Sequence, residues 1–423
     1  MLLGIIILDE IVVNRNRVDY FFSAIGNITK YFNPNHHMFL EYNHDISDVP
    51  ISILTIPFVA NVIPLVWMTD STLNVDELDR SFYECLNKIR LAYQCMFPSV
   101  RFKGNLEVDY IVANSYTPEV EAASLFSGGL DALTTFIRIK DKKPMLITEY
   151  GWHQDDVQFS EVWDADKKNA ESFAQLHGLT NIFIQSNYGT FIADERVDRD
   201  FSKSLGVSWW QGLHHGMAFL SAAMPIAFKF KVNCIYIASS LHIGHIAKCS
   251  SDPTVDNEMK FASGSVFHDA YELTRQQKVK VVVDYYSVTK EPVSIRVCFK
   301  KEQNCCKCEK CIRTILGIIA EGKNPQDFGF NTPENLSQHV YEFLVENVKY
   351  LPPDLIIMVW NLIKKRMAEN YDNVLYKDFD WFLHYDLAAE QRKSLLHYRV
   401  TKFFPILKRK ISDRIHSYFA QNT

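Results

Sequence analysis

The sequence predicts an α/β protein built on a parallel sheet with crossover helices, together with an N-terminal α+β domain and a helical C-terminal region. The chain has 423 residues, enough for two or three domains of about 100 to 200 residues each. Between residues 119 and 300, short apolar runs alternate with amphipathic stretches, as expected for a parallel sheet. With 47% hydrophobic residues, the chain can fill cores of this size.

Composition and charge exclude several classes of protein. Lys and Arg total 45 against 50 Asp and Glu, and the net charge of −5 gives no chain-wide basic field for nonspecific nucleic-acid binding. With 16 Gly and 15 Pro, the chain is neither collagen-like nor of low complexity. We expect no membrane-spanning helix and no export signal, because the apolar run of residues 2–8 stops at Asp9 and has no basic flank. A cytoplasmic protein without membrane contact is therefore expected.

Residues 1–115 are expected to form the N-terminal α+β domain. Residues 2–13 and 51–63 have the apolar character of β-strands. Residues 75–96 carry apolar side chains at helical spacing, with Asn74 as a candidate N-cap. This stretch therefore predicts one amphipathic helix.

Residues 116–325 form the expected catalytic domain. Its strand-like runs are followed by helical segments, and they cover residues 122–126, 144–148, 181–185 and 234–238. Helical patterns follow over residues 312–321, and then over 336–348, 355–370 and 388–419 in a C-terminal region of residues 326–423. The last segment is basic. We interpret it as a solvated helix face, with a surface for a polyanion or a partner as the alternative.

The strongest local signal is the string Ser127-Gly128-Gly129-Leu130-Asp131-Ala132, between a predicted strand and a predicted helix. Adjacent glycines let the backbone approach a ligand closely, and a helix N-terminus directs free amides at negative charge. The string therefore predicts a phosphate-binding loop, in which Ser127 donates a hydrogen bond and Asp131 holds the loop or carries Mg²⁺. A purely structural turn is the alternative.

Five of the nine cysteines fall within residues 298–311. Cys298, Cys305, Cys308 and Cys311 are spaced C-x6-C-x2-C-x2-C, and the two-residue gaps let thiolates converge on one tetrahedral ion. We therefore predict a closed, structural zinc site. An iron–sulfur cluster, free thiols and a redox pair are the alternatives, and Cys306 is the reserve for Cys298 as fourth ligand.

The glycine string resembles the SGGxDS signature of the PP-loop ATP pyrophosphatases, also called the adenine nucleotide alpha hydrolase-like superfamily, with Ala132 in place of the last serine. A PP-loop domain followed by C-x2-C-x2-C is similar to the cyano-deazaguanine synthases of the queuosine pathway, over residues 122–313. The resemblance implies a HUP-like sheet and ATP, Mg²⁺ and Zn²⁺ as cofactors. It places the nucleotide at Ser127, Gly128, Gly129, Leu130 and Asp131, and zinc at Cys298, Cys305, Cys308 and Cys311.

Two further matches concern catalytic residues. Residues 216–221 resemble the helix that this family writes RNxxFLS, with His215 and Gly216 where Arg and Asn are usual. Residues 273–278 resemble its LxKxE helix start, with Arg275 in place of Lys. The resemblance therefore implies Asp131, His215 and Arg275 as catalytic residues. Ser239 follows the fourth predicted strand, at the edge where open α/β sheets bind ligands, and could contact the nucleotide or simply cap a turn.

The resemblance implies a ligase that forms AMP and pyrophosphate. A substrate carboxylate would attack the α-phosphate of ATP, and ammonia or an amine would capture the acyl-adenylate. The substrate would be a small-molecule carboxylate such as a deazapurine or, as in relatives from anti-phage operons, a partner protein. The alternatives are tRNA thiolation, which needs a reactive cysteine and a basic surface, and a catalytically silent nucleotide-binding module.

Overall fold

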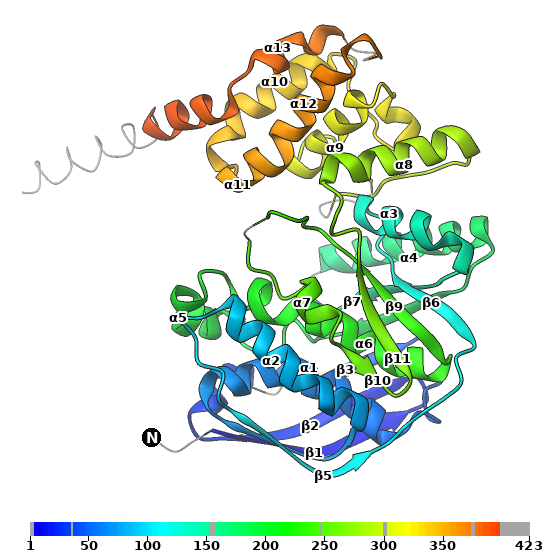
Figure 1. Cartoon of the computed structure of the whole chain (residues 1–423), viewed down its shortest axis with the longest axis vertical. Helices are drawn as coiled ribbons and strands as arrows, with labels where there is room; N and C mark the ends of the chain where they lie inside the picture. Colours follow the sequence, from blue (N-terminus) through cyan, green and yellow to red (C-terminus); the bar gives the residue numbers. More distant parts are fainter. Residues whose placement is uncertain are drawn as a thin grey trace, which may run out of the picture. The chain divides into compact units, whose positions relative to one another are not determined.

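The computed structural model describes residues 4–34, 37–152, 157–245, 247–298, 303–373 and 377–397. The chain forms two compact units (Figure 1). The first contains the residues up to Thr274 and two short later segments, 287–289 and 295–303. The second is formed mainly by the residues from Asn304 onward, together with residues 275–286.

The first unit is organised around one large mixed sheet. Over the described residues it has 11 strands, in the order β10-β11-β9-β6-β7-β8-β3-β2-β1-β4-β5. Their bounds are β1 Ile5–Asn14, β2 Arg17–Ile25, β3 Met38–Tyr42, β4 Thr72–Asp79, β5 Asn105–Val112, β6 Val120–Leu125, β7 Met145–Tyr150, β8 Asn181–Ser186, β9 Val232–Ala238, β10 Lys260–Phe261 and β11 Gly264–Asp269. The five consecutive strands β11-β9-β6-β7-β8 are parallel to one another, and so are β1 with β4 and β4 with β5. The remaining neighbouring pairs are antiparallel. The predicted α/β class is confirmed.

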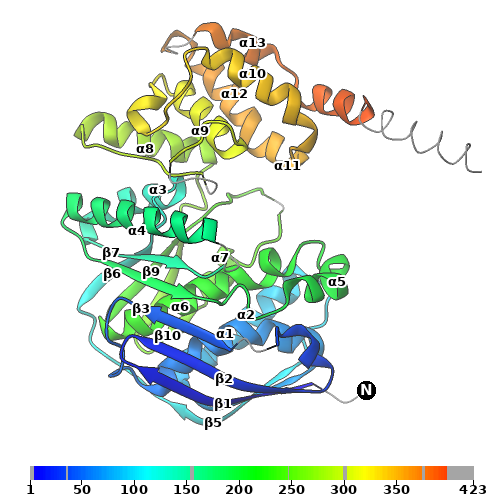
Figure 2. The same cartoon turned by 180° about the vertical axis from the view of Figure 1, so that it is seen from behind.

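Helices cover both faces of this sheet. Figure 2 shows α3 and α4 on one side of the central strands and α6 with α1 on the other. The helical elements of the unit are η1 Gly26–Tyr31, α1 Ile51–Thr69, α2 Arg80–Met96, α3 Leu130–Ile139, η2 Lys140–Lys142, α4 Val157–His177, α5 Asp194–Leu205, a π-turn η3 Trp210–His214 that continues into α6 His215–Lys229, and α7 Pro253–Asp256. The core between the sheet and α1 and α6 is mainly apolar, as Ile63 and Leu220 illustrate, and it encloses a buried polar contact of 2.8 Å between His214 Nε2 and Asn61 Oδ1.

The second unit is helical. Its elements are α8 Arg275–Thr289, of which residues 287–289 belong to the first unit, α9 Glu309–Ala320, η4 Pro325–Phe328, α10 Leu336–Asn347, η5 Val348–Tyr350, α11 Pro353–Leu355, a π-turn η6 Ile356–Trp360, α12 Asn361–Glu369, η7 Tyr371–Asn373, η8 Lys377–Phe379 and α13 Asp380–His384, with α-helix also over residues 387–397. Glu321, just after α9, accepts bonds from Arg366 at 2.7 Å and from Gln276 at 2.8 Å. This network joins α8, α9 and α12. The basic segment predicted to run to residue 419 lies outside the described residues beyond residue 397.

The predicted strands of the central sheet agree closely with the structure. The apolar runs at 122–126, 144–148, 181–185 and 234–238 correspond to β6, β7, β8 and β9. The boundary that we placed near residue 115 falls between β5 and β6, which belong to the same sheet. Because β3 pairs with β8, strands from before and after this position are joined by hydrogen bonds.

Two elements of the N-terminal part were predicted wrongly. Residues 51–63 are the first part of helix α1 and not a strand. This helix is apolar on every side and contains Pro57 and Pro64, so neither periodicity nor composition reveals it. Residues 75–79 belong to β4, and α2 begins at Arg80 after the N-cap Asp79, which accepts a bond from the Phe82 amide at 3.0 Å.

Helix α1 is longer than the apolar run of residues 2–8 on which the expectation of no membrane-spanning helix rested. By length and composition it is able to cross a membrane, with a mean hydropathy of 2.0 over its most apolar stretch. However, 94% of that stretch is buried inside the protein. The buried position fits the core helix of a globular unit, for which the same composition is needed.

Candidate functional site

The predicted phosphate loop joins β6 to α3. Gly128 has φ +68°, a left-handed conformation that glycine adopts without a side-chain clash. Gly129 is the N-cap of α3, and its amide donates to the Ser127 hydroxyl at 3.3 Å. Ser127 is exposed, whereas Gly128, Gly129 and Asp131 are half-buried. The loop is therefore a tight turn that faces solvent on the Ser127 side, with the first amides of α3 behind it.

The space beside the loop is narrow. A Cβ added to Gly129 would meet the Ser127 Oγ and the Arg296 carbonyl oxygen at 3.2 Å each. Leu130 and Ala132 point into the core, with exposed fractions of 1% and 5%. The Leu130 side chain thus anchors the start of α3 in the core. Only the backbone of Leu130 faces the loop. Asp131 lies in the first turn, where a carboxylate is favoured by the helix dipole.

Arg296 lies against the same loop, although no sequence motif identified it. Its amide donates to the Gly128 carbonyl at 2.9 Å. Its Cβ and Cδ are 3.9 Å from the position that a Gly128 Cβ would take. The guanidinium forms an ion pair with Asp166 of α4, and the Arg296 side chain is 10% exposed. An arginine is a common ligand for phosphate because its donors match the anion's oxygens.

Asp166 is half-buried, with 35% of its side chain exposed. Burial raises the pKa of Asp166, while the Arg296 charge acts in the opposite direction. The backbone and aliphatic stem of Arg296 thus lie against the glycine loop, while its guanidinium is held by Asp166 of α4.

The sheet order places the loop at a position where α/β proteins bind ligands. From β6 the chain continues to β7 and β8 on one side, and then returns to β9 and β11 on the other. All five strands are parallel, so their carboxyl ends lie at one edge. The strand order reverses between β6 and β9, and ligands of open α/β sheets bind in the crevice at such a switch point. The glycine loop begins at this point.

Ser239 lies at the same edge, directly after β9. Its amide donates to the Asp269 carbonyl at 2.9 Å, and its hydroxyl donates to the Leu241 carbonyl at 2.8 Å. The residue is 1% exposed. Its hydroxyl thus stabilises its own turn in this structure, which is the capping role that we left open.

His215, at the start of α6, is in a buried polar cluster. Its Nδ1 is 2.8 Å from the Trp210 carbonyl oxygen, so Nδ1 carries the proton and Nε2 is the acceptor. Nε2 lies 3.6 Å from the Cys249 Sγ. Burial lowers the pKa of His215. The ring is therefore neutral near pH 7 and does not supply the positive charge of an arginine at this position.

Cys249 lies outside the 298–311 cluster and contacts His215. It is 7% exposed, and burial raises the pKa of its thiol to about 12. A thiol with such a pKa is a poor nucleophile at neutral pH. The pair thus resembles a packed core contact more than a reactive site.

Arg275 begins α8 in the second unit. Its Nη2 donates to the Thr314 hydroxyl of α9 at 3.4 Å. Within that unit it therefore links two helices of the bundle. Its predicted catalytic role stays a prediction.

The four predicted metal ligands come together. The Sγ atoms of Cys298, Cys305, Cys308 and Cys311 all lie within 4.8 Å of one another. Cys311 is 3.5 Å from Cys308 and 3.9 Å from Cys305. A tetrahedral zinc ion with bonds of about 2.3 Å separates its sulfur ligands by about 3.8 Å, so the donor set and the spacing fit this ion. The group could hold a metal ion such as zinc.

Local structure explains why these sulfurs meet. Cys308 is the N-cap of α9 and Cys311 is in its first turn, so both thiols project near the helix start. The hydrogen bond with Cys308 and burial raise the pKa of the Cys311 thiol. Cys306 is directed elsewhere: its Sγ lies 3.6 Å from the Asn304 carbonyl oxygen, and its φ is +52°. The geometry therefore selects Cys298 over Cys306 for the group.

One acidic residue near the carboxyl edge of the parallel strands was not predicted from the sequence. Glu149 lies near the carboxyl end of β7, and its Oε2 accepts from the Tyr188 hydroxyl at 3.2 Å. Its Oε1 is buried with no hydrogen-bond partner among the described residues. Burial raises the pKa of Glu149 well above its usual range. Perturbed carboxyls often mark functional sites, but a single Glu in an apolar strand gives no sequence signal.

Comparison with known proteins gives no further identification. A scan against family models finds no match, and a search of curated proteins finds no significant relative. What the chain shows is a mixed α/β fold with a large, mostly parallel sheet and a four-cysteine group able to bind a metal ion.

Proposed function

We propose that this chain is an ATP-dependent enzyme of the PP-loop type that adenylates a carboxylate and releases pyrophosphate. One observation carries the proposal: the Ser127–Gly129 turn lies at the switch point of a parallel sheet, at the N-terminus of α3, with the backbone and aliphatic stem of Arg296 against it. Free amides at a helix N-terminus, with an arginine close in space, suit a polyphosphate.

The chemistry assigned to this site is a displacement at phosphorus. A substrate carboxylate oxygen attacks the α-phosphorus of ATP, and the bond to the bridging oxygen of pyrophosphate breaks. The α3 amides and Arg296 stabilise the negative charge that moves to pyrophosphate, and Asp131 would carry the Mg²⁺ that neutralises part of it. Ammonia or an amine then displaces AMP from the acyl-adenylate. No side-chain nucleophile is needed, so catalysis consists of positioning and electrostatics.

The cyano-deazaguanine synthases are the family that the sequence motifs resemble most. The four-cysteine group supports this relation, with zinc in a structural role because four thiolates leave no open position on the ion. His215 differs from the family pattern. Burial lowers its pKa, so the ring is neutral and lacks the positive charge of the arginine that the family has at this position. We therefore assign the reaction type to the family, and leave the substrate as a carboxylate of a deazapurine-like small molecule or of a partner protein.

The test measures pyrophosphate release from ATP by the full-length protein. Deazapurine carboxylates and candidate partner proteins serve as substrates, with ammonium as acceptor. We expect Arg296→Gln to weaken ATP binding at least tenfold, since charge-assisted hydrogen bonds contribute about 1.5–3 kcal/mol. Lys168→Gln is the matched control, because Lys168 is an exposed cation on the same helix as Asp166. Equal ATP affinity of the two variants would contradict the role of Arg296.

The alternative functions make different predictions in the same assay. A silent nucleotide-binding module would bind ATP without releasing pyrophosphate from any substrate. A tRNA-thiolating enzyme would release pyrophosphate only with tRNA. The buried Cys249 and Cys306, 7% and 4% exposed, do not favour thiolation.

A further inference from the structure

The strand β5 forms one end of the large sheet in the first unit. It pairs with β4 on one side, in a constant parallel register from Thr72 and Asn105 to Asp79 and Val112. On its other side, the described part of the chain provides no strand. Figure 1 and Figure 2 both show β5 at the rim of this unit. Among the described residues, the edge is therefore open along the whole strand.

The backbone of β5 has hydrogen-bonding groups directed to this edge. The Asn105 amide donates to the carbonyl of Ser71, just before β4, at 2.9 Å. In a parallel pair, every second residue bonds to the neighbouring strand, and the residues between them direct their amides and carbonyls to the other side. Because Asn105 bonds to the β4 side, Leu106, Val108 and Tyr110 are the residues whose peptide groups point to the open edge.

The segment of residues 1–3 is too short to cover the open edge. The Gly4 carbonyl accepts from the Thr72 amide at 2.9 Å, so this segment is attached on the β1 side of β4. A strand added to β5 would lie three strand spacings from β1, which is about 14 Å. Three extended residues span about 10 Å at most. The edge is thus accessible to a segment that comes from elsewhere.

The side chains on the two faces of β5 differ in chemistry. Leu106 and Val108 are half-buried and pack against the core of the unit. Tyr110 follows on the same face and is 69% exposed. Successive side chains of a strand alternate between faces, so Glu107 and Asp109 lie on the opposite face, where both are exposed. A strand next to β5 would therefore meet apolar side chains on one face and carboxylates on the other.

Glu107 and Asp109 determine which charge the edge attracts. Among the residues that the structure describes, no Lys, Arg or His lies within ion-pair distance of either carboxylate. Opposite charges across a strand pair stabilise it, and like charges destabilise it. A second copy of β5, paired antiparallel about Val108, would place Glu107 opposite Asp109. The edge therefore favours a basic partner over a second copy of the chain.

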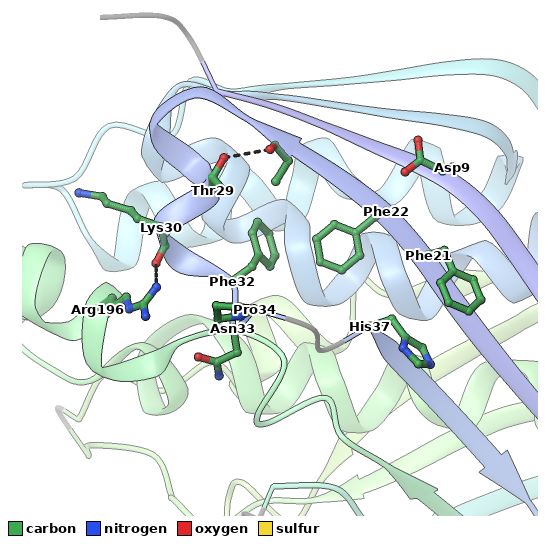
Figure 3. A pocket seen from close by; sticks show the side chains of 11 residues that line it. Asp9, Phe21, Phe22, Thr29, Lys30, Phe32, Asn33, Pro34, His37 and Arg196 are labelled. Atoms are coloured by element: carbon green, nitrogen blue, oxygen red, sulfur yellow. Dashed lines mark hydrogen bonds between the residues drawn. The ribbon is translucent and has the colours of Figure 1, made fainter.

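The first unit also has a cavity beside the end of β2, and its charge differs from that of β5. Its described lining includes Lys30 and Arg196 against Asp9 (Figure 3). Lys30 pairs with Asp200 at 2.6 Å, and Arg196 donates to the Lys30 carbonyl at 2.8 Å. A basic segment is therefore attracted to β5 and not to this cavity.

We propose that β5 binds an extended segment of a partner protein in which lysine or arginine alternates with apolar residues. The segment adds to the sheet as a further strand, and its backbone bonds to Leu106, Val108 and Tyr110. Its apolar side chains pack beside Tyr110, and its cations contact Glu107 and Asp109. Strand addition uses backbone bonds for affinity and alternate side chains for specificity. The inference does not depend on the nucleotide site.

The experiment selects peptides of about ten residues, long enough to pair with all of β5, from a displayed random library on the full-length protein. One enriched peptide is then labelled with fluorescein, and its affinity for the variants is measured by fluorescence anisotropy. Tyr110→Pro removes an amide that does not bond to β4, so it blocks strand addition and keeps the pairing of β4 with β5. Tyr110→Thr keeps this amide and is the matched control.

A second pair of variants tests the charge of the edge. Glu107→Lys combined with Asp109→Lys reverses the charge of the outer face of β5. Glu171→Lys, at an exposed position of α4, is the control for a charge reversal elsewhere on the same unit. Neither variant changes a backbone group, so the pair tests the site even if Tyr110→Pro impairs folding.

We expect enriched peptides to alternate Lys or Arg with apolar residues. Tyr110→Pro should weaken binding at least tenfold, and Tyr110→Thr less than threefold. The combined reversal at Glu107 and Asp109 should also weaken binding at least tenfold, whereas Glu171→Lys should change it less than twofold.

Three results would overturn the proposal. In the first, no sequence is enriched. In the second, the enriched peptide binds the Tyr110→Pro and charge-reversed variants as tightly as the wild type. In the third, the edge is occupied by this chain itself: a synthetic peptide of residues 398–423 binds the wild type and not Tyr110→Pro, or sedimentation equilibrium shows a wild-type dimer that Tyr110→Pro dissociates.

Discussion

The glycine loop can be tested by adding a single methyl group. Gly128 has φ +68°, and an alanine held there costs about 1–2 kcal/mol, partly offset by about 0.4–1 kcal/mol from a stiffer unfolded chain. The new Cβ would lie 3.9 Å from the Arg296 Cβ and Cδ, which is an ordinary contact. Gly128→Ala should therefore lower the free energy of unfolding of the first unit by about 1 kcal/mol.

Gly206 provides a matched control for this prediction. It has φ +77° at the end of α5, and a Cβ there would meet nothing within 4 Å. Gly206→Ala should cost the same stability in urea unfolding followed by tryptophan fluorescence, but leave ATP affinity unchanged. Gly128→Ala should also weaken ATP binding at least fivefold, because the turn that presents the α3 amides is altered. If both variants bind ATP as the wild type does, the loop does not hold phosphate.

Three further predictions concern pH, metal and the helical unit. Burial raises the pKa of Asp194 to about 7, so the folded state retains its proton and the wild type loses stability as pH rises from about 4 to 7. Asp194→Asn should therefore be about 2 kcal/mol more stable at pH 8 and nearly equal at pH 4.5, in urea unfolding; an equal difference at both pH values contradicts this. Cys308→Ser should lower the zinc content measured by mass spectrometry from one per chain, and chelators should lower the melting temperature of the wild type only. Arg366→Ala leaves the Glu321 carboxylate, 3% exposed, without its cation, and should destabilise the second unit by about 3 kcal/mol in thermal unfolding; Lys365→Ala, 72% exposed, should change nothing measurable.

Much of the central sheet could be predicted because its strands are short apolar runs between helical segments. The same criterion failed at residues 51–63, since α1 is buried on all sides and an apolar run without periodicity fits a strand or a helix equally well. It also failed at residues 75–79, because apolar positions of β4 happened to continue the spacing of α2. Only tertiary packing distinguishes these cases.

The site was predictable where its residues are close in sequence. The glycine loop and Cys305, Cys308 and Cys311 are local patterns with a direct chemical meaning. Arg296 comes far later in the chain and reaches the loop through a backbone bond to Gly128, which no local pattern encodes. Likewise, the neutral state of His215 follows from its burial.

Calorimetric titration of the full-length protein with α,β-methylene-ATP in the presence of Mg²⁺ tests the central claim most directly. This analogue keeps the triphosphate but cannot be cleaved between the α and β phosphates. If the loop after β6 holds a nucleotide, binding will saturate at one molecule per chain, and inorganic pyrophosphate will displace it. No saturable binding up to millimolar analogue, or binding that pyrophosphate does not affect, would contradict the assignment.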